Sequence, residues 1–383
     1  MHLDLTMKQA VIKRTVRKFA EERITPVLRE MDASGRFPSE IASEMASLQY
    51  FGLEIPSEYG GAGLDAVSYA IVIEEISRVS GAMGLCLSVH NSVSASPVYH
   101  FGTESQRRNF LVSMATGQRI GTFCLTEPNA GSDASSLETI AIGEGDGYVL
   151  NGNKIFVTNG GVSGTNLIFA ITNPSKEQRE YTVFIVESER AGLEKGPAED
   201  MMGMRGNPVC PITLSDCRVP LENRLGEEGQ GMKIALSTLN GGRIGIGAQA
   251  LGIAQASLDV SLKYARERRQ FGRSLSELGG IQGFLSDMAT RIEAARLLIY
   301  RASHLKAQGL PFARESAMAK LYASEVANRV TSQAIQLHGG YGYIREYPVE
   351  RMFRDSKLCE IGEGTSEIQR LVISRELLKA SAA

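Results

Sequence analysis

The sequence predicts a mainly α-helical protein with a small antiparallel β domain in its middle. Prolines number four in residues 1–120, six in 121–230 and two in 231–383. Because proline breaks helices, the last segment is free to form long ones. Apolar residues recur there every three to four positions, whereas the middle segment contains β-rich runs bounded by turn residues. We therefore expect three domains, over 1–120, 121–230 and 231–383.

The first segment is expected to begin with an amphipathic helix and to be interrupted by a loop, PSEYGGAGLD, at 56–65. The opening residues, MHLDLTMKQAVIKRTVRKFAEERI, contain neither an apolar signal-peptide core nor a small-residue cleavage site. Nowhere does the sequence approach the ~18–20 consecutive apolar residues of a membrane span. We therefore expect a cytoplasmic protein, bacterial or archaeal, with no part in a membrane.

The middle segment contains the strand signals. Asn151-Gly152 lies between two β-rich runs in YVLNGNKIFVTNG (148–160), which predicts a hairpin turn at that dipeptide. Further strands are expected at TNLIFAIT (165–172), YTVFIVE (181–187) and PITLSDCRV (211–219). These runs predict a compact β domain.

Three apolar stripes predict bundle helices in the last segment. The residues of the second stripe are spaced 3, 4, 3, 4 and 3 apart, which places them on one face of a helix. Core packing is their expected role. The stripes comprise Leu251, Ala254, Leu258, Leu262 and Ala265; Leu285, Met288, Ile292, Ala295, Ile299 and Ala302; and Ala319, Tyr322, Val326, Val330 and Leu337.

Composition excludes several classes of function. With 41 lysines and arginines against 43 aspartates and glutamates, the net charge is −2, which gives no reason to bind nucleic acid or an acidic membrane. The five cysteines lack a CxxC pair, and the five histidines lack metal-ligand spacing. The GxSxG, P-loop and GxGxxG motifs are absent. We expect a reducing compartment and no metal site, catalytic triad or nicotinamide site.

Two glycine-bearing segments are candidate ligand sites. Residues 124–133, CLTEPNAGSD, follow a strand, and their hydroxyl and backbone N–H groups suit a ring edge or a phosphate. Residues 336–343, QLHGGYGY, lie at the C-terminal end of a helix, where glycine lets a phosphate approach the backbone. For each segment, a helix cap or a turn is the alternative.

A third segment, EIGEGTSEIQ at 360–369, contains a candidate general base. Ser366 and Gln369 form a capping box, which predicts a helix that starts near residue 366. Glu363 then precedes the helix N-terminus. The helix dipole favours its ionised form while burial opposes it, and a carboxylate balanced in this way suits proton abstraction. The alternative is a solvated loop glutamate.

These motifs resemble the two signatures of the acyl-CoA dehydrogenase family. Residues 124–133 fit the first signature, and the resemblance extends from the 56–65 loop to EGTSEIQR near the end of the chain. It implies an N-terminal helical domain, a middle antiparallel β-barrel domain and a C-terminal four-helix bundle, assembled as a homotetramer. The second signature is matched by Gln336, Gly339, Gly340, Gly342, Tyr343, Glu346, Arg351 and Asp355.

The resemblance also implies non-covalently bound FAD, an acyl-CoA substrate and an electron-transfer flavoprotein as acceptor. Glu363 matches the catalytic base of the straight-chain members. Arg268, Gln270 and Phe271 would reach the FAD of a neighbouring subunit. The implied cofactor-binding residues are Leu125, Thr126, Ser132, Phe156, Thr158, Arg268, Gln270, Phe271, Gln336, Gly339, Gly340, Thr365 and Glu367, and the implied substrate-binding residues are Ser132, Asn240, Arg243 and Gly364.

Five positions differ from those of some or all other family members. Phe156 stands where tryptophan usually lies beside the flavin, and Leu278-Gly279 replaces a Phe-Gln pair, which removes one family contact to FAD. Gly242 stands where isovaleryl-type and long-chain members place the base, so only Glu363 is available. Gly84 stands where glutaryl-specific relatives place an arginine.

The resemblance therefore implies FAD-dependent oxidation of a saturated, uncharged acyl-CoA to trans-2-enoyl-CoA, with Glu363 as base and hydride transfer to flavin N5. A short acyl chain is favoured, because the local similarity is to bacterial butyryl-type enzymes. Branched- and medium-chain substrates stay open, as does a flavin oxidase or monooxygenase on this scaffold. A nucleic-acid-binding member would need a basic surface and usually lacks the base, so the charge and Glu363 oppose it.

Overall fold

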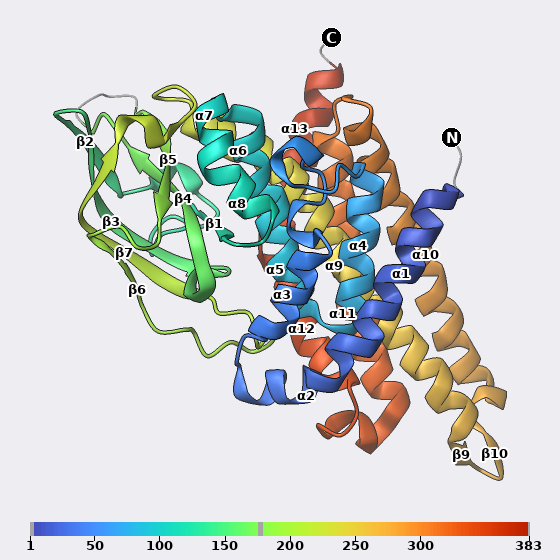
Figure 1. The fold of residues 1–383 in the computed structure, drawn as a ribbon. Helices are drawn as coiled ribbons and strands as arrows, with labels where there is room; N and C mark the ends of the chain where they lie inside the picture. The colour runs from blue at the N-terminus through green and yellow to red at the C-terminus, as the bar shows by residue number, and fades with distance from the viewer. Residues whose placement is uncertain (1–3, 175–178, 382–383) are drawn as a thin grey trace.

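A computed structural model describes residues 4–174 and 179–381, and N-terminal helices, a middle sheet and long C-terminal helices follow one another as predicted (Figure 1). The sheet lies to one side of a helical body made by the other two parts. The N-terminal helices are α1 Met7–Phe19, α2 Thr25–Ser34, α3 Ser39–Ser47, α4 Ala66–Val79, α5 Gly81–Val89, α6 Ser96–Phe101, α7 Glu104–Gln106 and α8 Val112–Ala115. The C-terminal helices are α9 Gly231–Glu267, α10 Gly279–Ala307, α11 Ala313–His338, α12 Val349–Ile361 and α13 Ser366–Ser381.

The middle part forms an eight-stranded sheet in the order β6-β7-β3-β2-β4-β5-β8, with β1 paired to β4. Most pairs are antiparallel, but β1 runs parallel to β4, and β2 also meets β4 in parallel. The sheet is therefore mixed rather than antiparallel throughout, because the end of β1 pairs with β4 at Cys124–Ile168 and the start of β2 pairs with it at Ile140–Ile171, so both strands follow β4 in its own direction. The strands are β1 Ile120–Cys124, β2 Ile140–Glu144, β3 Gly147–Val157, β4 Ser163–Ile171, β5 Tyr181–Glu187, β6 Leu193–Lys195, β7 Cys210–Pro220 and β8 Arg224–Leu225.

The predicted hairpin turn at Asn151-Gly152 is wrong. Both residues lie inside β3, and the hairpin turn is at residues 145–146, between β2 and β3. Gly152 sits where the pairing of β3 with β7 shifts register, and a Cβ there would overlap Thr139. Asn151 is held across the sheet, since its Oδ1 accepts a hydrogen bond from the Asp216 N–H at 2.8 Å. The Asn-Gly pair therefore marks a β-bulge.

The predicted apolar stripes form the core between α9, α10 and α11, with only Leu262, Leu285 and Tyr322 partly exposed. α9 is the central helix, because it packs against α10, α11 and α12 and also against α4 and α5. Glycine permits this close approach, since a Cβ on Gly245 would overlap the side chain of Tyr69. Within the residues described, no helix is long and apolar enough to cross a membrane.

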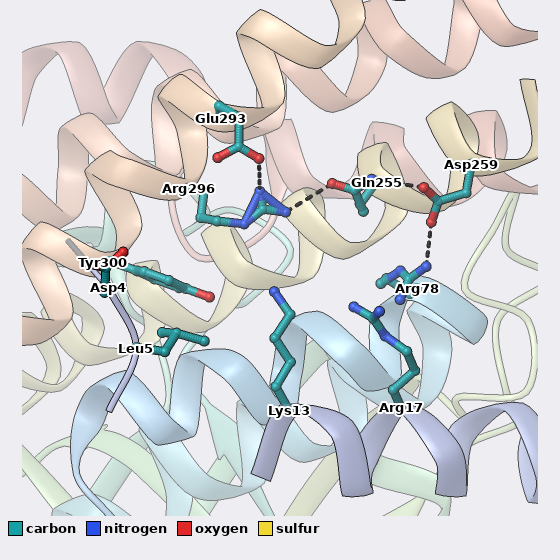
Figure 2. Close-up of a pocket in the computed structure, with 10 residues that line it drawn as sticks. All are labelled: Asp4, Leu5, Lys13, Arg17, Arg78, Gln255, Asp259, Glu293, Arg296 and Tyr300. Carbon is teal, nitrogen blue, oxygen red and sulfur yellow. Dashed lines mark hydrogen bonds and ion pairs between the residues drawn. The ribbon is translucent and has the colours of Figure 1, made fainter. Parts of the chain in front are cut away.

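Paired charges fasten α1 to this core, and Figure 2 shows Arg17 of α1 beside Arg78, which pairs with Asp259 of α9. Glu75 of α4 is buried and accepts two hydrogen bonds from Arg17 of α1, both at 2.8 Å. Arg78 bridges Glu75 to Asp259 of α9. A cavity of about 460 Å³ lies over these side chains, but their charges already bind one another, so we assign them a structural role. We call Arg17, Glu74, Glu75, Arg78, Asp259, Glu293 and Arg296 the ionic cluster.

Candidate active site

Glu363 lies in the short loop between α12 and α13, with its backbone in the left-handed region. Its φ is 53°, and that of Gly364 is 96°. A left-handed conformation costs a residue with a side chain about 1–2 kcal/mol, so contacts around the loop must hold it. Gln369 supplies one of these contacts, because its Nε2 donates to the Gly364 carbonyl at 2.8 Å.

α13 begins at Ser366 as predicted, but its cap is not the predicted pair. Thr365 takes the N-cap position, and its Oγ1 accepts a hydrogen bond from the Ile368 N–H at 3.4 Å. The Ser366 hydroxyl is buried without a partner among the residues described. Gln369 cannot close a capping box, because its side chain binds the loop carbonyls. The predicted capping box is wrong.

The Glu363 carboxylate is buried against α9. Neither of its oxygens has a hydrogen-bond partner in the part of the chain that the structure describes. A Cβ on Gly242 of α9 would overlap this carboxylate, and it would also crowd a methyl group of Val93. Gly242 therefore provides the space that the Glu363 side chain occupies.

The surroundings of Glu363 poise it for proton exchange at neutral pH. Burial raises the pKa of Glu363 to about 7, against the opposing positive charges of Lys320 and Arg243. A carboxyl group that titrates near neutral pH can act as a general base there. The buried oxygens are inconsistent with a solvated loop glutamate.

Two predicted substrate residues, Asn240 and Arg243, lie one helical turn apart on α9. Arg243 Nη1 donates to Asn240 Oδ1 at 2.6 Å, and the Arg243 side chain is buried. Burial lowers the pKa of Arg243, whereas the nearby charge of Glu363 raises it. The structure thus brings Asn240, Arg243, Glu363 and Gly364 together.

Lys320 of α11 is a site residue that the sequence analysis missed. Its side chain is fully buried, and its Nζ donates to the Gly364 carbonyl at 2.6 Å. Burial lowers the pKa of Lys320 to about 8. A signal existed, because Lys320 follows the buried Ser316 by one turn and precedes the buried Ala323. A lysine on the buried face of a helix is uncommon and calls for a partner.

Two segments of the β domain that were expected to face a flavin ring are neighbours in space. The Ile155 N–H donates to the Thr126 carbonyl at 3.0 Å, which joins β3 to the segment after β1. Thr126 and Thr158 are partly exposed, and Phe156 is 64% exposed. Ser132 is exposed in the loop that follows Thr126. Together they form an accessible polar surface with one aromatic side chain.

A buried ion pair holds this surface in place. Lys154 Nζ lies 2.6 Å from a Glu127 carboxylate oxygen, and both side chains are inaccessible to solvent. Leu125, one residue before Thr126, is buried in an apolar cluster that includes Ile234 of α9. The β segment is therefore tied to the helix that carries Gly242.

A second group of predicted cofactor residues lines a groove of about 470 Å³ at the end of the helical body away from the sheet (Figure 1). The Arg268 guanidinium carbon lies 5.4 Å from the centroid of the Tyr341 ring. The two glycines of the groove face open space, so their backbone is accessible. The predicted residues in its lining are Arg268, Gln270, Gly339 and Gly340.

Phe271 and Gln336 do not line this groove. Phe271 is at the tip of the hairpin formed by β9 Arg269–Gln270 and β10 Arg273–Ser274, and its side chain is 90% exposed. Gln336 is exposed on the last turn of α11. Thr365 is partly exposed and Glu367 exposed at the start of α13, apart from the groove.

These residues fit FAD. A guanidinium group and open glycine backbone suit a diphosphate, and Arg268, Gly339 and Gly340 supply both in one groove. Partly exposed hydroxyl groups and backbone at Thr126 and Thr158 suit the polar edge of a flavin ring.

A helical body with a mid-chain sheet, a surface that suits a flavin ring and a buried carboxylate without a partner among the described residues agree with the class of flavin-dependent acyl-CoA oxidoreductases. Three family models match consecutive parts of the chain: the acyl-CoA dehydrogenase N-terminal domain over residues 6–118, its middle domain over 122–217 and its C-terminal domain over 229–378. The chain therefore belongs to the acyl-CoA dehydrogenase family and is an FAD-dependent oxidoreductase.

The chain is similar over its full length to enzymes of stated specificity. It is 47% identical to the short-chain specific acyl-CoA dehydrogenase of Clostridium acetobutylicum, covering 99% of this chain and 100% of that one. Butyryl-CoA dehydrogenase from Megasphaera elsdenii superposes with a TM-score of 0.97 at 43% identity, over 99% and 100% of the two chains. A chain in a structure described as the electron transferring flavoprotein of Acidaminococcus fermentans gives 0.97 at 45% identity, with the same coverage.

Proposed function

We propose that this protein oxidises a short, uncharged, saturated acyl-CoA to the trans-2-enoyl-CoA. The observation that carries the proposal is the buried Glu363 carboxylate, which has no hydrogen-bond partner among the described residues and a pKa raised by burial to about 7. Glu363 removes a proton from the α-carbon of the thioester. FAD, when bound, would supply the acceptor for the hydride lost from the β-carbon; with the α-proton taken by Glu363, the α and β C–H bonds would be replaced by a C=C bond.

The Glu363 backbone has a second role in the proposal. An α-proton becomes acidic enough to remove only if the charge that develops on the thioester oxygen is stabilised. The Glu363 N–H makes no backbone hydrogen bond in the described ranges of the chain, so it is free to donate to that oxygen. The left-handed conformation at Glu363 then serves to aim both groups at one substrate.

The proposed cofactor contacts fall into two sets. Leu125, Thr126, Phe156 and Thr158 would hold the flavin ring, with Ser132 between the ring and the thioester. The groove at the far end of the body would hold the diphosphate of a neighbouring chain's FAD, because it lies at the opposite end from the ring segments (Figure 1). Phe271 and Gln336 would extend that contact, and Thr365 and Glu367 would complete the ring pocket. This arrangement supports the proposed homotetramer.

We propose that α5 lies beside the acyl end of the substrate, and its residues favour an uncharged acyl chain. Leu85, Cys86 and Leu87 of α5 are buried and neutral. A Cβ on Gly84 would overlap the Ser77 hydroxyl, so this position has no room for an arginine to bind a distal carboxylate. Asn240, Arg243 and Gly364 would contact the CoA end and the thioester. The full-length similarity to short-chain and butyryl-CoA dehydrogenases supports the same size class.

An electron-transferring flavoprotein is the proposed acceptor, supported by the likeness to the Acidaminococcus fermentans chain. Reaction with oxygen distinguishes this proposal from a flavin oxidase. After anaerobic reduction by substrate, admission of air should reoxidise the flavin slowly. Reoxidation as fast as turnover would make the protein an oxidase.

A panel of thioesters tests the reaction and the substrate together. The purified flavoprotein is mixed anaerobically with butyryl-, isovaleryl-, octanoyl- and glutaryl-CoA, and flavin bleaching is followed by absorbance. Butyryl-CoA should give the highest kcat/KM and glutaryl-CoA none. Faster bleaching by isovaleryl- or octanoyl-CoA would overturn the size assignment, and no bleaching by any thioester would overturn the reaction.

A further inference from the structure

Lys320 stands out as a buried cation without an ion-pair partner. Within residues 4–174 and 179–381 no carboxylate lies within 4.0 Å of its Nζ. Its one hydrogen bond goes to the neutral Gly364 carbonyl, at 2.6 Å. Lys154, the other fully buried lysine among the described residues, pairs directly with Glu127 at 2.6 Å. Since an unpaired buried charge is costly, its retention beside the Glu363 loop requires an explanation.

The contact of Lys320 falls at the strained point of the loop. Glu363 and Gly364 are both left-handed, and the carbonyl that follows them accepts two hydrogen bonds, from Lys320 Nζ and from Gln369 Nε2. Fixing this carbonyl fixes the direction of the Glu363 side chain and of its N–H. Of the two donors, only Lys320 also brings a positive charge towards the Glu363 carboxylate.

We propose that Lys320 is a positioning residue for the base: it holds the Gly364 carbonyl in place, and its charge favours the ionised form of Glu363. The inference rests on the proposed role of Glu363 as base. Lys320 touches neither substrate nor cofactor in this assignment and acts through the loop and through the field at the carboxylate.

Other charged and titratable groups lie near Lys320 and Glu363 and also affect their ionisation. Arg243 of α9 adds a second positive charge near Glu363, and Tyr69 of α4 faces it as a neutral phenol, whose pKa is raised by burial. Near Lys320, the charge of Glu360 of α12 favours its charged form and that of Arg243 opposes it, while the Cys359 thiol is neutral because burial raises its pKa to about 12. None of these groups contacts the Gly364 carbonyl, so the combination of hydrogen bond and charge belongs to Lys320.

The test compares two donors to one carbonyl. Lys320→Met removes the hydrogen bond and the charge, whereas the matched control Gln369→Met removes only neutral hydrogen bonds, to the Gly364 and Glu363 carbonyls. The rate of anaerobic flavin reduction by butyryl-CoA is measured in the holoenzymes between pH 5 and 9. In the wild type the rate rises with pH as Glu363 ionises.

We expect this rise to move to higher pH by about one unit in Lys320→Met, so that the rate at pH 6 falls about tenfold more than the rate at pH 9. Gln369→Met should lower the rate at all pH values and leave the position of the rise unchanged. Lys320→Arg, which keeps the charge, should restore the wild-type position.

A rise at the wild-type pH in Lys320→Met, or an equal displacement in Gln369→Met, would overturn the proposal. If Lys320→Met does not give a folded flavoprotein, Lys320→Gln provides the neutral variant, with a side chain that remains polar. Failure of the proposed function can be told apart from failure of the role of Lys320. If Glu363 is not the base, Glu363→Gln would reduce its flavin at the wild-type rate. An inactive Glu363→Gln with an undisplaced Lys320→Met profile would refute only the role of Lys320.

Discussion

The carboxylates of Glu75 and Glu363 are both buried in the helical body, but their surroundings shift the two pKa values in opposite directions. Burial acts to raise the pKa of Glu75, but the hydrogen bonds from Arg17 and the charges of Arg78, Arg17 and Lys13 outweigh it, so that its pKa lies below the usual value. Glu363 has no hydrogen-bond partner among the described residues, and burial raises its pKa to about 7. In the ionic cluster the charged groups pair with one another, whereas the carboxylate of the active-site loop forms no such pair and can react. A large polar cavity is therefore a poorer guide to chemistry here than an unpaired carboxylate.

The largest expected effect separates the two glutamates by activity. Glu363→Gln keeps side-chain volume but removes the basic oxygen, so flavin reduction by butyryl-CoA should slow by about 10⁴-fold, the upper end for loss of a general base. Gly242 supplies no second carboxylate. The substrate should still perturb the flavin spectrum on mixing, which shows that binding survives. A near wild-type rate in stopped-flow measurements would show that Glu363 is not the base.

The same substitution should stabilise the fold above neutral pH. The pKa of Glu363 in the folded protein is about 7, so it keeps its proton up to that pH, whereas the pKa of a free glutamate is 4.5. Stability therefore falls as the pH rises between these values, and ionised Glu363 costs roughly 3 kcal/mol above pH 7. In urea unfolding, Glu363→Gln should raise the midpoint at pH 8 and leave it unchanged at pH 4. A lower midpoint at pH 8 would contradict the unpaired state of this carboxylate.

Glu75→Gln should have the opposite effects. It leaves Arg17 and Arg78 without their shared carboxylate, and unfolding at pH 7 should become easier by about 2–3 kcal/mol, less than for a fully buried pair because Arg17 is 41% exposed. Because the pKa of Glu75 is lowered, this contribution is present above pH 4.5 and is lost as the pH falls below it. The kcat should stay near wild type. Glu44→Gln, which breaks a surface pair with Arg23, is the control and should cost under about 1 kcal/mol.

The smallest effect is expected at the edge of the ionic cluster. Lys13 Nζ lies 3.7 Å from Glu74 and 3.6 Å from Glu75, beyond hydrogen-bond distance. Lys13→Met should therefore change the free energy of unfolding by about 0.5 kcal/mol or less. A loss as large as that of Glu75→Gln would mean that Lys13 is an integral partner in the cluster.

Local sequence patterns predicted the fold well where local structure decides it. The three-part order and the bundle stripes follow from proline placement and helical periodicity, which neighbouring residues determine. The turn at Asn151-Gly152 failed because Asn151 is bound by Asp216, in a strand 65 residues later. The capping box failed for a similar reason, since the Gln369 side chain is drawn to the loop carbonyls.

In the candidate site, too, the sequence predicted what adjacent residues determine and missed what distant contacts determine. Glu363 was identified because it lies directly before the predicted start of α13 in the sequence. Lys320 was missed because its hydrogen-bond partner among the described residues is Gly364, 44 residues away, and nothing near Lys320 in the sequence indicates that contact. Its position on the buried face of α11 was the available signal. The role of Lys320 becomes clear only from its hydrogen bond to the Gly364 carbonyl.

The exposed tip of the β9–β10 hairpin has a consequence for handling the protein. If Phe271 and the adjoining groove bind the FAD of a neighbouring chain, as proposed, each chain supplies only part of every FAD site. A single chain then cannot form a complete site. FAD binding then depends on protein concentration. Dilution below the concentration at which the chains associate should release the yellow flavin from every chain. Concentrating the sample in the presence of FAD should restore the bound flavin.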